Sequence, residues 1–505
     1  MPKGQEDGIP YISPKDFLEN GEIAFEKAKK ISDEDFKSLC KKIYPEYGDI
    51  LLSRYGTVGE VRLVKTYLPF QASYSIAIIK PIDKETSRFI ETALRSAVVR
   101  SQINSYVRGV TQLDLGLGHI RKLFLPLPPL SEQKRILSIL DELFTQLNAG
   151  VDLLKKLKVK LKRYRQAVLK AAVEGKLTQD WREAHQDELE PASALLARIL
   201  KERREKWEAE QWAKMQAKGK APKDDKWKLK YKEPAAPDTT ELLKLPEGWK
   251  WVTLEQINNI KRTITYAVIK LGEHVDDGVP TLRSSNVRHL YLDPKGIKKI
   301  SPNLSNEYSR TILQGGEVLV TIRGTLGGVI AVPNRCVGSN ISREVAMISL
   351  AEGIVPDFCA IMIGSKPIHN WLSRRTKGIA YTGINIETLK RTPIPISSHR
   401  EQIEIIEKVN HYSSICDEFE KTLDRSLKRA EKLRQSILKK AFEGKLAPQD
   451  PNDEPVSVLL ARIQVEKAKK EAEEKAKKGK GRKRKGKGGK VADVEQLELI
   501  EVFEE

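Results

Sequence analysis

A long internal repeat constrains the fold of this chain more than any other feature. Residues 48–59 read GDILLSRYGTVG, and residues 316–327, 268 positions later, read GEVLVTIRGTLG. Further along, RQAVLKAAVEGKL (165–177) returns as RQSILKKAFEGKL (434–446) at an offset of 269. A nearly constant offset over this span indicates a tandem duplication. The period is much longer than that of a solenoid repeat, so each copy must contain whole domains.

Each copy begins with a segment rich in Val, Ile, Gly and Pro, at residues 8–130 and 245–398. Short runs of alternating character, such as GDILLSRYG and GEVLVTIRG, lie between turn residues. This pattern predicts a mixed α/β (α+β) domain with a curved sheet, which we call a head. Ser53 and Thr321 should lie within strands, and the GTVG and GTLG segments should form tight turns.

Each copy continues into a long helical segment with one apolar seam. Residues 131–175 contain no proline, and apolar residues recur every seven positions, which predicts a coiled-coil helix about 65 Å long at about 1.5 Å per residue. Such a helix needs a partner, and the equivalent helix can pair with it antiparallel, about a pseudo-twofold axis. The sequence therefore predicts two heads on one spacer. The seam positions are Leu140, Leu143, Leu147, Leu154, Leu157, Leu161, Tyr164, Val168 and Ala171 in the first copy, and Val409, Tyr412, Cys416, Phe419, Leu423, Ala430, Leu433 and Ile437 in the second.

The charge balance points to a polyanionic partner. The chain has 505 residues and a formal net charge of +20, with a pI of about 9.5, which favours nucleic acid over a membrane surface. It has no apolar run long enough to span a bilayer and no N-terminal signal core. Its four cysteines are far apart and form no metal or redox motif, as expected of a cytoplasmic protein.

Two charged segments each keep two interpretations open. KKGKGRKRKGKGGK (477–490), followed by an acidic tail, is of low complexity and suits either a nonspecific DNA anchor or a solvated tail. Residues 201–244 are charged and contain Trp and Tyr. They suit a linker into the second head or a surface for single-stranded nucleic acid.

No catalytic motif is present. The sequence lacks a GxxxxGK[ST] loop and the Asn/Asp-Pro-Pro-aromatic motif of adenine methylation. The EGK tripeptides at 174–176 and 443–445 fall at helix ends with a structural glycine, which does not make a nuclease site. The seven histidines show no metal-ligand spacing. We therefore predict no metal, no cofactor and no active site.

Several motifs resemble the specificity (S) subunit of type I restriction-modification enzymes. They are PLPPLSEQKRI (126–136), its weaker echo PIPISSHREQIEI (393–405), the two EGKL helix ends, and LPEGWKWVTLEQI (245–257), which resembles the usual opening of a target-recognition domain. The resemblance covers nearly the whole chain in the family's order. It implies a noncatalytic subunit whose heads each recognise one half of a gapped, two-part target in double-stranded DNA, with the helices as spacer.

The resemblance also implies protein partners. Two modification (methyltransferase) subunits, which bind S-adenosylmethionine and methylate adenine, would dock on the helices, and motor-nuclease restriction subunits would join that core. Three alternatives stay open: a methylation-only specificity subunit, a coiled-coil adaptor or DNA-binding module outside restriction-modification, and a complete enzyme acting alone. The missing catalytic motifs argue against the last. DNA binding that weakens steeply with salt would separate a DNA reader from an adaptor.

The two heads differ at their beginnings. In the second head LPEGWKWVTLEQI and about twenty more residues precede the GVP motif, whereas seven residues precede GIP in the first. We expect an opening strand or helix to be missing from the first head. A misassigned start, a truncated head and a segment supplied from elsewhere are all compatible with this difference.

These arguments divide the chain into six parts. The expected parts are a first, N-terminally shortened target-recognition domain (1–130), a first spacer helix with its repeat segment (131–200), a charged linker (201–244), a second target-recognition domain (245–398), a second spacer helix with its repeat segment (399–465), and a basic arm with an acidic tail (466–505).

Candidates for DNA contacts lie in three matching segments of the two heads. Glycine turns bring backbone N–H groups close to phosphates, arginine can bond phosphate or guanine, and Asn and Gln suit adenine. The same residues also suit ordinary turns and packing. The candidates are Ser13, Lys15, Arg54, Tyr55, Thr57, Thr111 and Gln112 in the first head, and Arg283, Ser284, Asn286, Arg323, Thr325, Tyr381 and Thr382 in the second.

Overall fold

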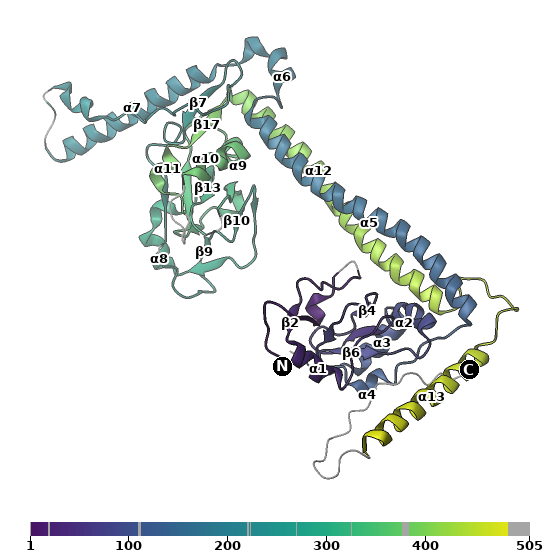
Figure 1. Ribbon diagram of the computed structural model, residues 1–505. Coiled ribbons are helices and arrows are strands. Elements are labelled where there is room, and N and C mark those ends of the chain that lie inside the picture. Colours follow the sequence, from purple (N-terminus) through teal and green to yellow (C-terminus); the bar gives the residue numbers. More distant parts are fainter. Residues whose placement is uncertain are drawn as a thin grey trace. The chain divides into compact units, whose positions relative to one another are not determined.

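The chain forms two compact units, each of which combines one head with parts of both long helices (Figure 1). The first unit is Met1–Lys155 with Asp424–Glu505, and the second is Lys156–Leu423. The computed structural model describes residues 2–18, 21–109, 113–219, 222, 224–268, 270–324, 326–375 and 383–482, with side chains up to residue 473.

The two long helices have equal lengths and end alike. α5 (Leu130–Val173) and α12 (His399–Phe442) each contain 44 residues, so each is about 66 Å long. Each ends at a glycine with positive φ, 66° at Gly175 and 68° at Gly444, a conformation that glycine adopts without a Cβ penalty. Within the described residues, no helix is long and apolar enough to cross a membrane.

The start of each long helix packs antiparallel against the end of the other. In the second unit the rings of Tyr164 and Tyr412 meet edge to face at 6.3 Å, and Arg165 pairs with Glu420 at 3.2 Å. In the first unit the Arg434 guanidinium lies 4.8 Å above the Phe144 ring. The predicted antiparallel pairing is therefore confirmed.

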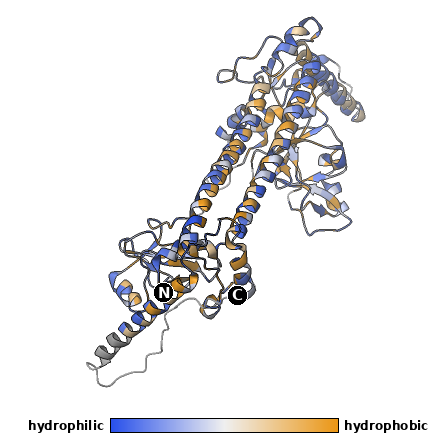
Figure 2. Cartoon of the chain, turned by 90° about the vertical axis from the view of Figure 1, so that its right-hand side faces the viewer, coloured by the Kyte–Doolittle hydropathy of each residue, from blue (hydrophilic) through white to orange (hydrophobic). Residues whose placement is uncertain are grey.

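The pairing covers one line of the predicted heptad seam more completely than the other. Leu140 and Val168 are buried and Leu147, Leu154 and Leu161 are half-buried. The other line is covered only in part, because Tyr164 meets the Tyr412 ring while much of the line stays exposed, and Figure 2 shows apolar residues in orange along both helices. The exposed seam residues are Leu157 (40 %), Tyr164 (47 %), Phe419 (59 %) and Leu433 (49 %).

The first head (residues 2–129) contains two three-stranded sheets, in the orders β2-β1-β5 and β4-β3-β6. Ser53 ends strand β3, as predicted. The strands are β1 (Ile9–Ile12), β2 (Lys29–Ile31), β3 (Ile50–Ser53), β4 (Val61–Leu63), β5 (Gln71–Ala72) and β6 (Ile76–Ile79), and the helices are α1 (Asp33–Cys40), α2 (Ser87–Leu94), α3 (Ala97–Tyr106) and α4 (Leu117–Ile120).

The second head (residues 245–398) repeats these sheets as β12-β9-β15 and β14-β13-β16-β8, with Thr321 at the end of β13. The registers match: Tyr11 pairs with Gln71 as Thr281 pairs with Asn340. The strands are β7 (Lys250–Thr253), β8 (Thr265–Tyr266), β9 (Val279–Leu282), β10 (Val287–Arg288), β11 (Tyr291–Leu292), β12 (Lys298–Ile300), β13 (Glu317–Thr321), β14 (Val329–Ala331), β15 (Asn340–Ile341), β16 (Val345–Ser349) and β17 (Pro393–Ile396), and the helices are α8 (Pro302–Glu307), α9 (Pro356–Gly364), α10 (Lys366–Arg374) and α11 (Ile386–Lys390).

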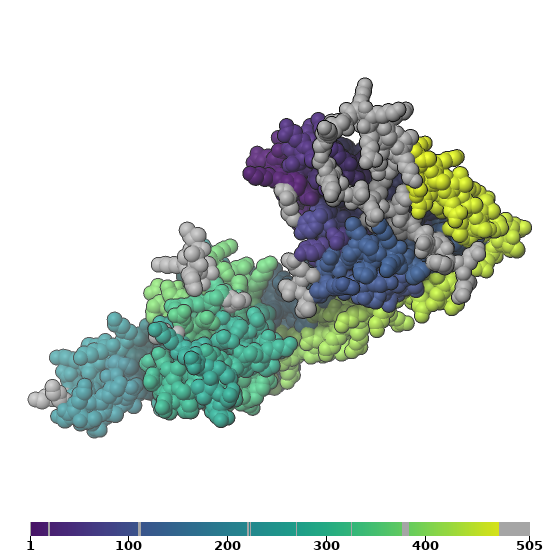
Figure 3. Space-filling view, turned by 90° about the horizontal axis from the view of Figure 1, so that it is seen from below, coloured from purple at the N-terminus to yellow at the C-terminus, as the bar shows by residue number. Residues whose placement is uncertain are grey.

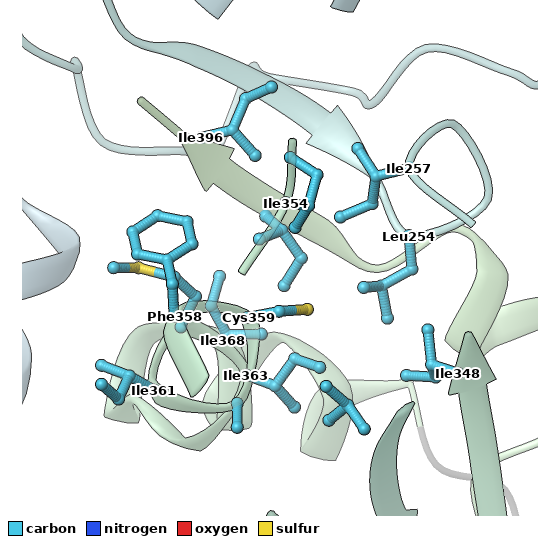
Figure 4. Packing of buried hydrophobic residues seen from close by; sticks show 14 of the residues in the cluster. Leu254, Ile257, Ile348, Ile354, Phe358, Cys359, Ile361, Ile363, Ile368 and Ile396 are labelled. Atoms are coloured by element: carbon cyan, nitrogen blue, oxygen red, sulfur yellow. The ribbon is translucent and has the colours of Figure 1, made fainter. Parts of the chain in front are cut away.

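An opening segment, residues 245–277, distinguishes the second head. It contributes β7, which pairs antiparallel with β17, and β8, which extends the β16 edge. Behind β7, Leu254 and Ile257 are fully buried. Figure 4 shows both side chains pointing into the cluster that holds Ile348, Cys359 and Ile396. The predicted extra element is therefore a strand with a buried turn behind it.

Each repeat copy ends in a helix that packs on one head: α7 (Ala192–Ala217) of the first copy packs on the second head, and α13 (Val456–Arg482) of the second copy packs on the first head. α7 contributes Leu195, Leu196 and Ile199 to the core of the second unit. Its repeat counterpart α13 lies against the first head, where Figure 3 shows it in yellow. Lys470 Nζ of α13 donates a hydrogen bond of 3.4 Å to the Ile82 carbonyl of that head. The remaining helix of the second unit is α6 (Gln179–Ala184).

Candidate nucleic-acid interface

The glycine turns of the two heads are built by the same hydrogen bonds. The Ser53 hydroxyl accepts from the Glu60 N–H at 2.8 Å, and the Thr321 hydroxyl accepts from the Gly328 N–H at 2.8 Å. Gly56 and Gly324 have φ of 77° and 76°, a left-handed conformation that favours glycine. The repeated GT-x-G sequence therefore specifies one turn twice.

A buried carboxylate fixes the strand that leads into each turn. Asp49 and Glu317, at equivalent positions, are fully buried. Glu317 accepts backbone N–H bonds from Gln314 at 2.7 Å and Gly315 at 2.8 Å and pairs with Arg262. Asp49 accepts the Glu46 N–H at 2.8 Å.

The cations that pair with these carboxylates differ in origin. Asp49 is paired with Lys80 at 2.8 Å and with Lys84, both of which follow it within the first head. Glu317 relies on Arg262, which belongs to the opening segment. Each buried carboxylate is thus both hydrogen-bonded and neutralised, as the low dielectric of a protein interior requires.

In each head, the first or second described residue beyond the gap at 110–112 or 376–382 forms a hydrogen bond with the main chain at the glycine turn. In the first head the Gly56 N–H donates to the Leu113 carbonyl at 2.9 Å. In the second, the Ile384 N–H donates to the Ile322 carbonyl at 2.8 Å. Five of the predicted contact residues lie outside the described residues: Thr111, Gln112, Thr325, Tyr381 and Thr382.

The Arg54 guanidinium donates hydrogen bonds to two other segments of the first head. It donates to Asp114 Oδ1 at 2.8 Å and to the carbonyls of Leu115 and Tyr74, both at 3.1 Å. The equivalent residue of the second head is Ile322, which is buried. Arg54 therefore acts in this structure as a scaffold residue that ties the turn to its neighbouring segments.

The next residue marks a chemical difference between the two heads. Tyr55 packs against Tyr74 with ring centroids 5.6 Å apart, and Tyr74 is 51 % exposed. The equivalent positions in the second head are Arg323 and Arg343, both exposed. Arg323 also lies 5.6 Å above the ring of Tyr266. One surface is aromatic, and the other is cationic.

In the loops after β1 and β9, the first loop residue donates a hydrogen bond to the side chain of the residue three positions later. The Ser13 N–H and hydroxyl both donate to Asp16 Oδ2 at 2.8 Å, and the Arg283 N–H donates to Asn286 Oδ1 at 3.2 Å. Asn286 is fully buried and donates to the carbonyls of Asp293 and Lys295. Ser13 and Asn286 therefore shape the loops.

Three other predicted residues of these loops and turns remain at the surface. Lys15 and Thr57 are exposed. Ser284 donates to Glu344 Oε2 at 2.7 Å and lies against the glycine turn, since a Cβ on Gly324 would come 3.3 Å from the Ser284 hydroxyl. Arg283 is half-buried and donates to the Gly296 carbonyl at 2.9 Å.

Sequence comparison missed Tyr74, Arg343 and Tyr266. The signal that could have found the first two is their equivalence in the repeat: QASYSIAIIK (71–80) aligns with NISREVAMIS (340–349), and the Tyr/Arg difference falls beside the shared Ser. Among the described residues, no group of three or more His, Cys, Asp or Glu side chains could hold a metal ion.

Comparison with known proteins gives consistent matches. The family model for the type I restriction modification DNA specificity domain matches residues 3–163 and 246–429. The type I restriction enzyme EcoBI specificity subunit of Escherichia coli is 31 % identical over 395 residues, which cover 76 % of this chain and 73 % of that protein.

Two further matches extend the coverage. The EcoKI specificity subunit of Escherichia coli (strain K12) is 25 % identical over 451 residues, covering 86 % of this chain and 84 % of that protein. A chain from a solved structure of a type I restriction-modification system superimposes with a TM-score of 0.57 at 16 % identity, over 87 % of this chain and 92 % of that chain. At that identity the likeness shows the fold.

Proposed function

The chain belongs to the type I restriction-modification DNA specificity family, and from this premise we propose that its two heads recognise the two halves of one gapped, double-stranded DNA target. The observation that carries this proposal is the pair of glycine turns. Their main-chain geometry is the same, and the side chains beside them are Tyr55 and Tyr74 in one head and Arg323 and Arg343 in the other. A shared frame with different surface chemistry suits two half-sites of different sequence.

The proposed contact surface of each head comprises exposed or half-buried side chains around its turn, together with five residues that the sequence predicts and that lie outside the described residues. Arginine can bond the guanine edge or a phosphate, and tyrosine can pack on bases or the sugar backbone and donate its hydroxyl. We assign Arg54, Ser13, Arg283 and Asn286 to shaping this surface. The proposed contacts are Lys15, Tyr55, Thr57 and Tyr74 in the first head and Ser284, Arg323 and Arg343 in the second, together with Thr111, Gln112, Thr325, Tyr381 and Thr382.

The domain boundaries predicted from the sequence stand as part of the proposal. The two target-recognition domains are residues 1–130 and 245–398, joined by the spacer segments 131–200 and 399–465 with the linker between them. Because α5 and α12 have a fixed length, the antiparallel pair would set the number of base pairs between the two half-sites.

The chemistry of the system would come from partner subunits, because the chain is a recognition component. We propose that two modification subunits dock on the long helices and that motor-nuclease subunits join that core. The exposed seam residues Leu157, Tyr164, Phe419 and Leu433 offer apolar surface for this docking. All of this would take place in the cytoplasm, where the DNA is.

A methylation map tests the proposal directly. The chain would be expressed with its modification subunit in a host that lacks DNA methylation, and N6-methyladenine would be mapped by single-molecule sequencing. We expect one two-part motif with a gap of fixed length. Methylation at a continuous, ungapped motif would contradict the bipartite proposal. Absence of methylation, with a complex that assembles normally, would contradict recognition by these two heads.

A further inference from the structure

The strand edge that β7 covers in the second head is open in the first, as far as the described residues of that head go. β17 pairs with β7 through Ile394 and Ile396, since Pro393 and Pro395 have no N–H. The equivalent segment of the first head is residues 124–127. Its Phe124 is satisfied on one side by Gln102, which accepts the Phe124 N–H at 2.9 Å and donates to its carbonyl at 3.0 Å.

The main-chain N–H and C=O groups of Leu125 and Leu127 face the side of the segment that no described strand covers. Successive residues of an extended chain direct their N–H and C=O groups to opposite edges. Within the described part of the chain, the main chains of Leu125 and Leu127 have no hydrogen-bond partner. Leu125 is nevertheless buried, so this edge lies under a groove.

An apolar pocket adjoins the open edge. It lies between Ile79, Phe89, Ile90 and Leu127 of the first head and Leu460 and Ile463 of α13. By the repeat offset the first four residues correspond to Ile348, Phe358, Cys359 and Ile396. These second-head residues form the cluster into which Leu254 and Ile257 point in Figure 4. The pocket of the first head is therefore equivalent to the region of the second head in which Leu254 and Ile257 are buried.

A buried carboxylate next to this region lacks its counterpart's donors. Glu401 accepts three hydrogen bonds, from Trp249 Nε1 at 2.8 Å, Thr178 Oγ1 at 2.7 Å and Arg182 Nη1 at 2.6 Å. The equivalent Glu132 is 5 % exposed, and no hydrogen bond to its carboxylate is found within the described residues. Burial raises the pKa of the Glu132 carboxyl above its usual value.

The covering helix is also less deeply packed on the first head. Leu196 and Ile199 of α7 are buried in the core cluster that also holds Val252 of the opening segment, and the Ala192 N–H of α7 donates to the Gly248 carbonyl at 2.8 Å. Their α13 counterparts, Leu460 and Ile463, are half-buried and line the pocket. α13 thus covers the groove without filling it.

We propose that this groove is a docking site for an extended peptide segment of the kind found at residues 245–257, added as a strand along Leu125 and Leu127. Its leucine and isoleucine would enter the pocket, and its tryptophan N–H would donate to Glu132. The second head supplies the pattern of this occupant, because LPEGWKWVTLEQI already fills the equivalent groove there. Strand addition to an open edge gains main-chain hydrogen bonds, and side-chain pockets add selectivity.

The first test is a binding measurement with the full chain and a synthetic, fluorescently labelled LPEGWKWVTLEQI peptide, without DNA or partner subunits. We expect saturable binding by fluorescence anisotropy. A peptide with Trp249→Ala should bind at least about tenfold more weakly, because it loses a hydrogen bond to a charged acceptor. The Glu132→Ala chain should lose affinity for the parent peptide by a similar factor, and a scrambled peptide should not bind.

Location is tested with a photo-reactive leucine at position 254 of the peptide. We expect crosslinks within residues 79–93 or 124–127. Fusing the peptide ahead of residue 1 through a Gly/Ser linker should raise the melting temperature and abolish binding of free peptide, whereas a fused scrambled peptide should do neither. Crosslinks confined to residues 245–398, absence of saturable binding, or unchanged affinity in the Glu132→Ala chain would each overturn the proposal. None of these readouts depends on DNA recognition.

Discussion

The first and second heads share two sheets but close them differently. Both place a hydroxyl-bearing residue at the end of the central strand, a left-handed glycine after it, and a buried carboxylate before it. The second head adds β7 and β8, which cover two sheet edges. The common frame depends on main-chain hydrogen bonds and buried charge, so it tolerates different surface residues and even a different number of strands.

The comparison also shows how one structural need is met twice. The carboxylate before the turn must be neutralised, and the second head does this with a single arginine from its opening segment. The first head uses Lys80 and Lys84, which lie beyond β6. Within the described residues, the first head has no opening strand, and it does not need one to keep its turn.

The largest expected effect is the loss of the second head's opening strand. Trp249 is buried, and its indole N–H donates to Glu401. Replacing a buried tryptophan with alanine costs about 3–5 kcal/mol. We expect Trp249→Ala to increase hydrogen exchange across β7, β17 and α9, measured by mass spectrometry.

The first head provides the internal control for this experiment. Exchange in β3, β4 and β6 should stay unchanged, because Trp249 packs in a core cluster to which the described residues of these strands contribute nothing. Equal loosening of both heads would contradict the idea that the two are closed independently.

A matched pair of charge deletions should separate the two ways of neutralising the strand carboxylate. Arg262→Ala leaves Glu317 buried without a cation, which costs about 3 kcal/mol, the lower end of the range for a broken buried pair because two backbone N–H bonds remain. Lys80→Ala should cost only about 1 kcal/mol, because Lys84 still pairs with Asp49. Hydrogen exchange of β13 and β3 reports the two effects separately.

A Lys80→Ala effect as large as that of Arg262→Ala would contradict this explanation. If Lys80→Ala loosened β3 as much as Arg262→Ala loosened β13, the second lysine would contribute nothing to Asp49. A double variant, Lys80→Ala with Lys84→Ala, should then be no worse than the single one, whereas we expect it to approach the Arg262→Ala effect.

The surface difference between the heads predicts a change in DNA recognition. Arg323→Tyr with Arg343→Tyr should alter one half of the methylated motif and leave the other half intact, with a loss of about 1–3 kcal/mol for each specific base contact removed. Tyr55→Arg with Tyr74→Arg should alter the other half. If both pairs changed the same half-site, or neither did, the assignment of these residues to separate readers would fall.

The same variants should change the salt dependence of DNA binding in opposite directions. Each phosphate contact adds about 0.9 to the slope of log K against log salt. Removing two arginines should therefore lower the slope by up to about 2, and adding two should raise it. Equal slopes for all three chains would show that these positions touch no phosphate.

The sequence alone was enough to predict the two heads, the long helices and their antiparallel pairing, because the two copies of the repeat can be compared position by position. It could not predict which polar residues are exposed. Arg54 is bound by Asp114, sixty positions away, and Asn286 is buried by its own loop. The heptad pattern likewise marked apolar positions without showing that the partner helix leaves Leu157, Phe419 and Leu433 exposed.

The smallest expected effect concerns the pH dependence of the first head. Burial raises the pKa of Glu132 above its ordinary value of 4.5, and no described residue donates a hydrogen bond to the carboxylate to compensate for lost water. The folded state therefore binds this proton more tightly than the unfolded state does. Stability linked to Glu132 is present below pH 4.5 and is lost as pH rises through the folded-state pKa, by at most about 1.4 kcal/mol per pH unit. We expect Glu132→Gln to remove this loss, so that amide hydrogens of the first head exchange more slowly in the variant than in the parent at pH 7 and equally fast at pH 4.

Glu401 provides the matched control. Because Glu401 is held by three donors, Glu401→Gln should have the opposite sign at pH 7 and loosen the second head. Parallel behaviour of the two glutamines would mean that Glu132 already has a donor, and the peptide-docking site would then lack the unsatisfied group that distinguishes it.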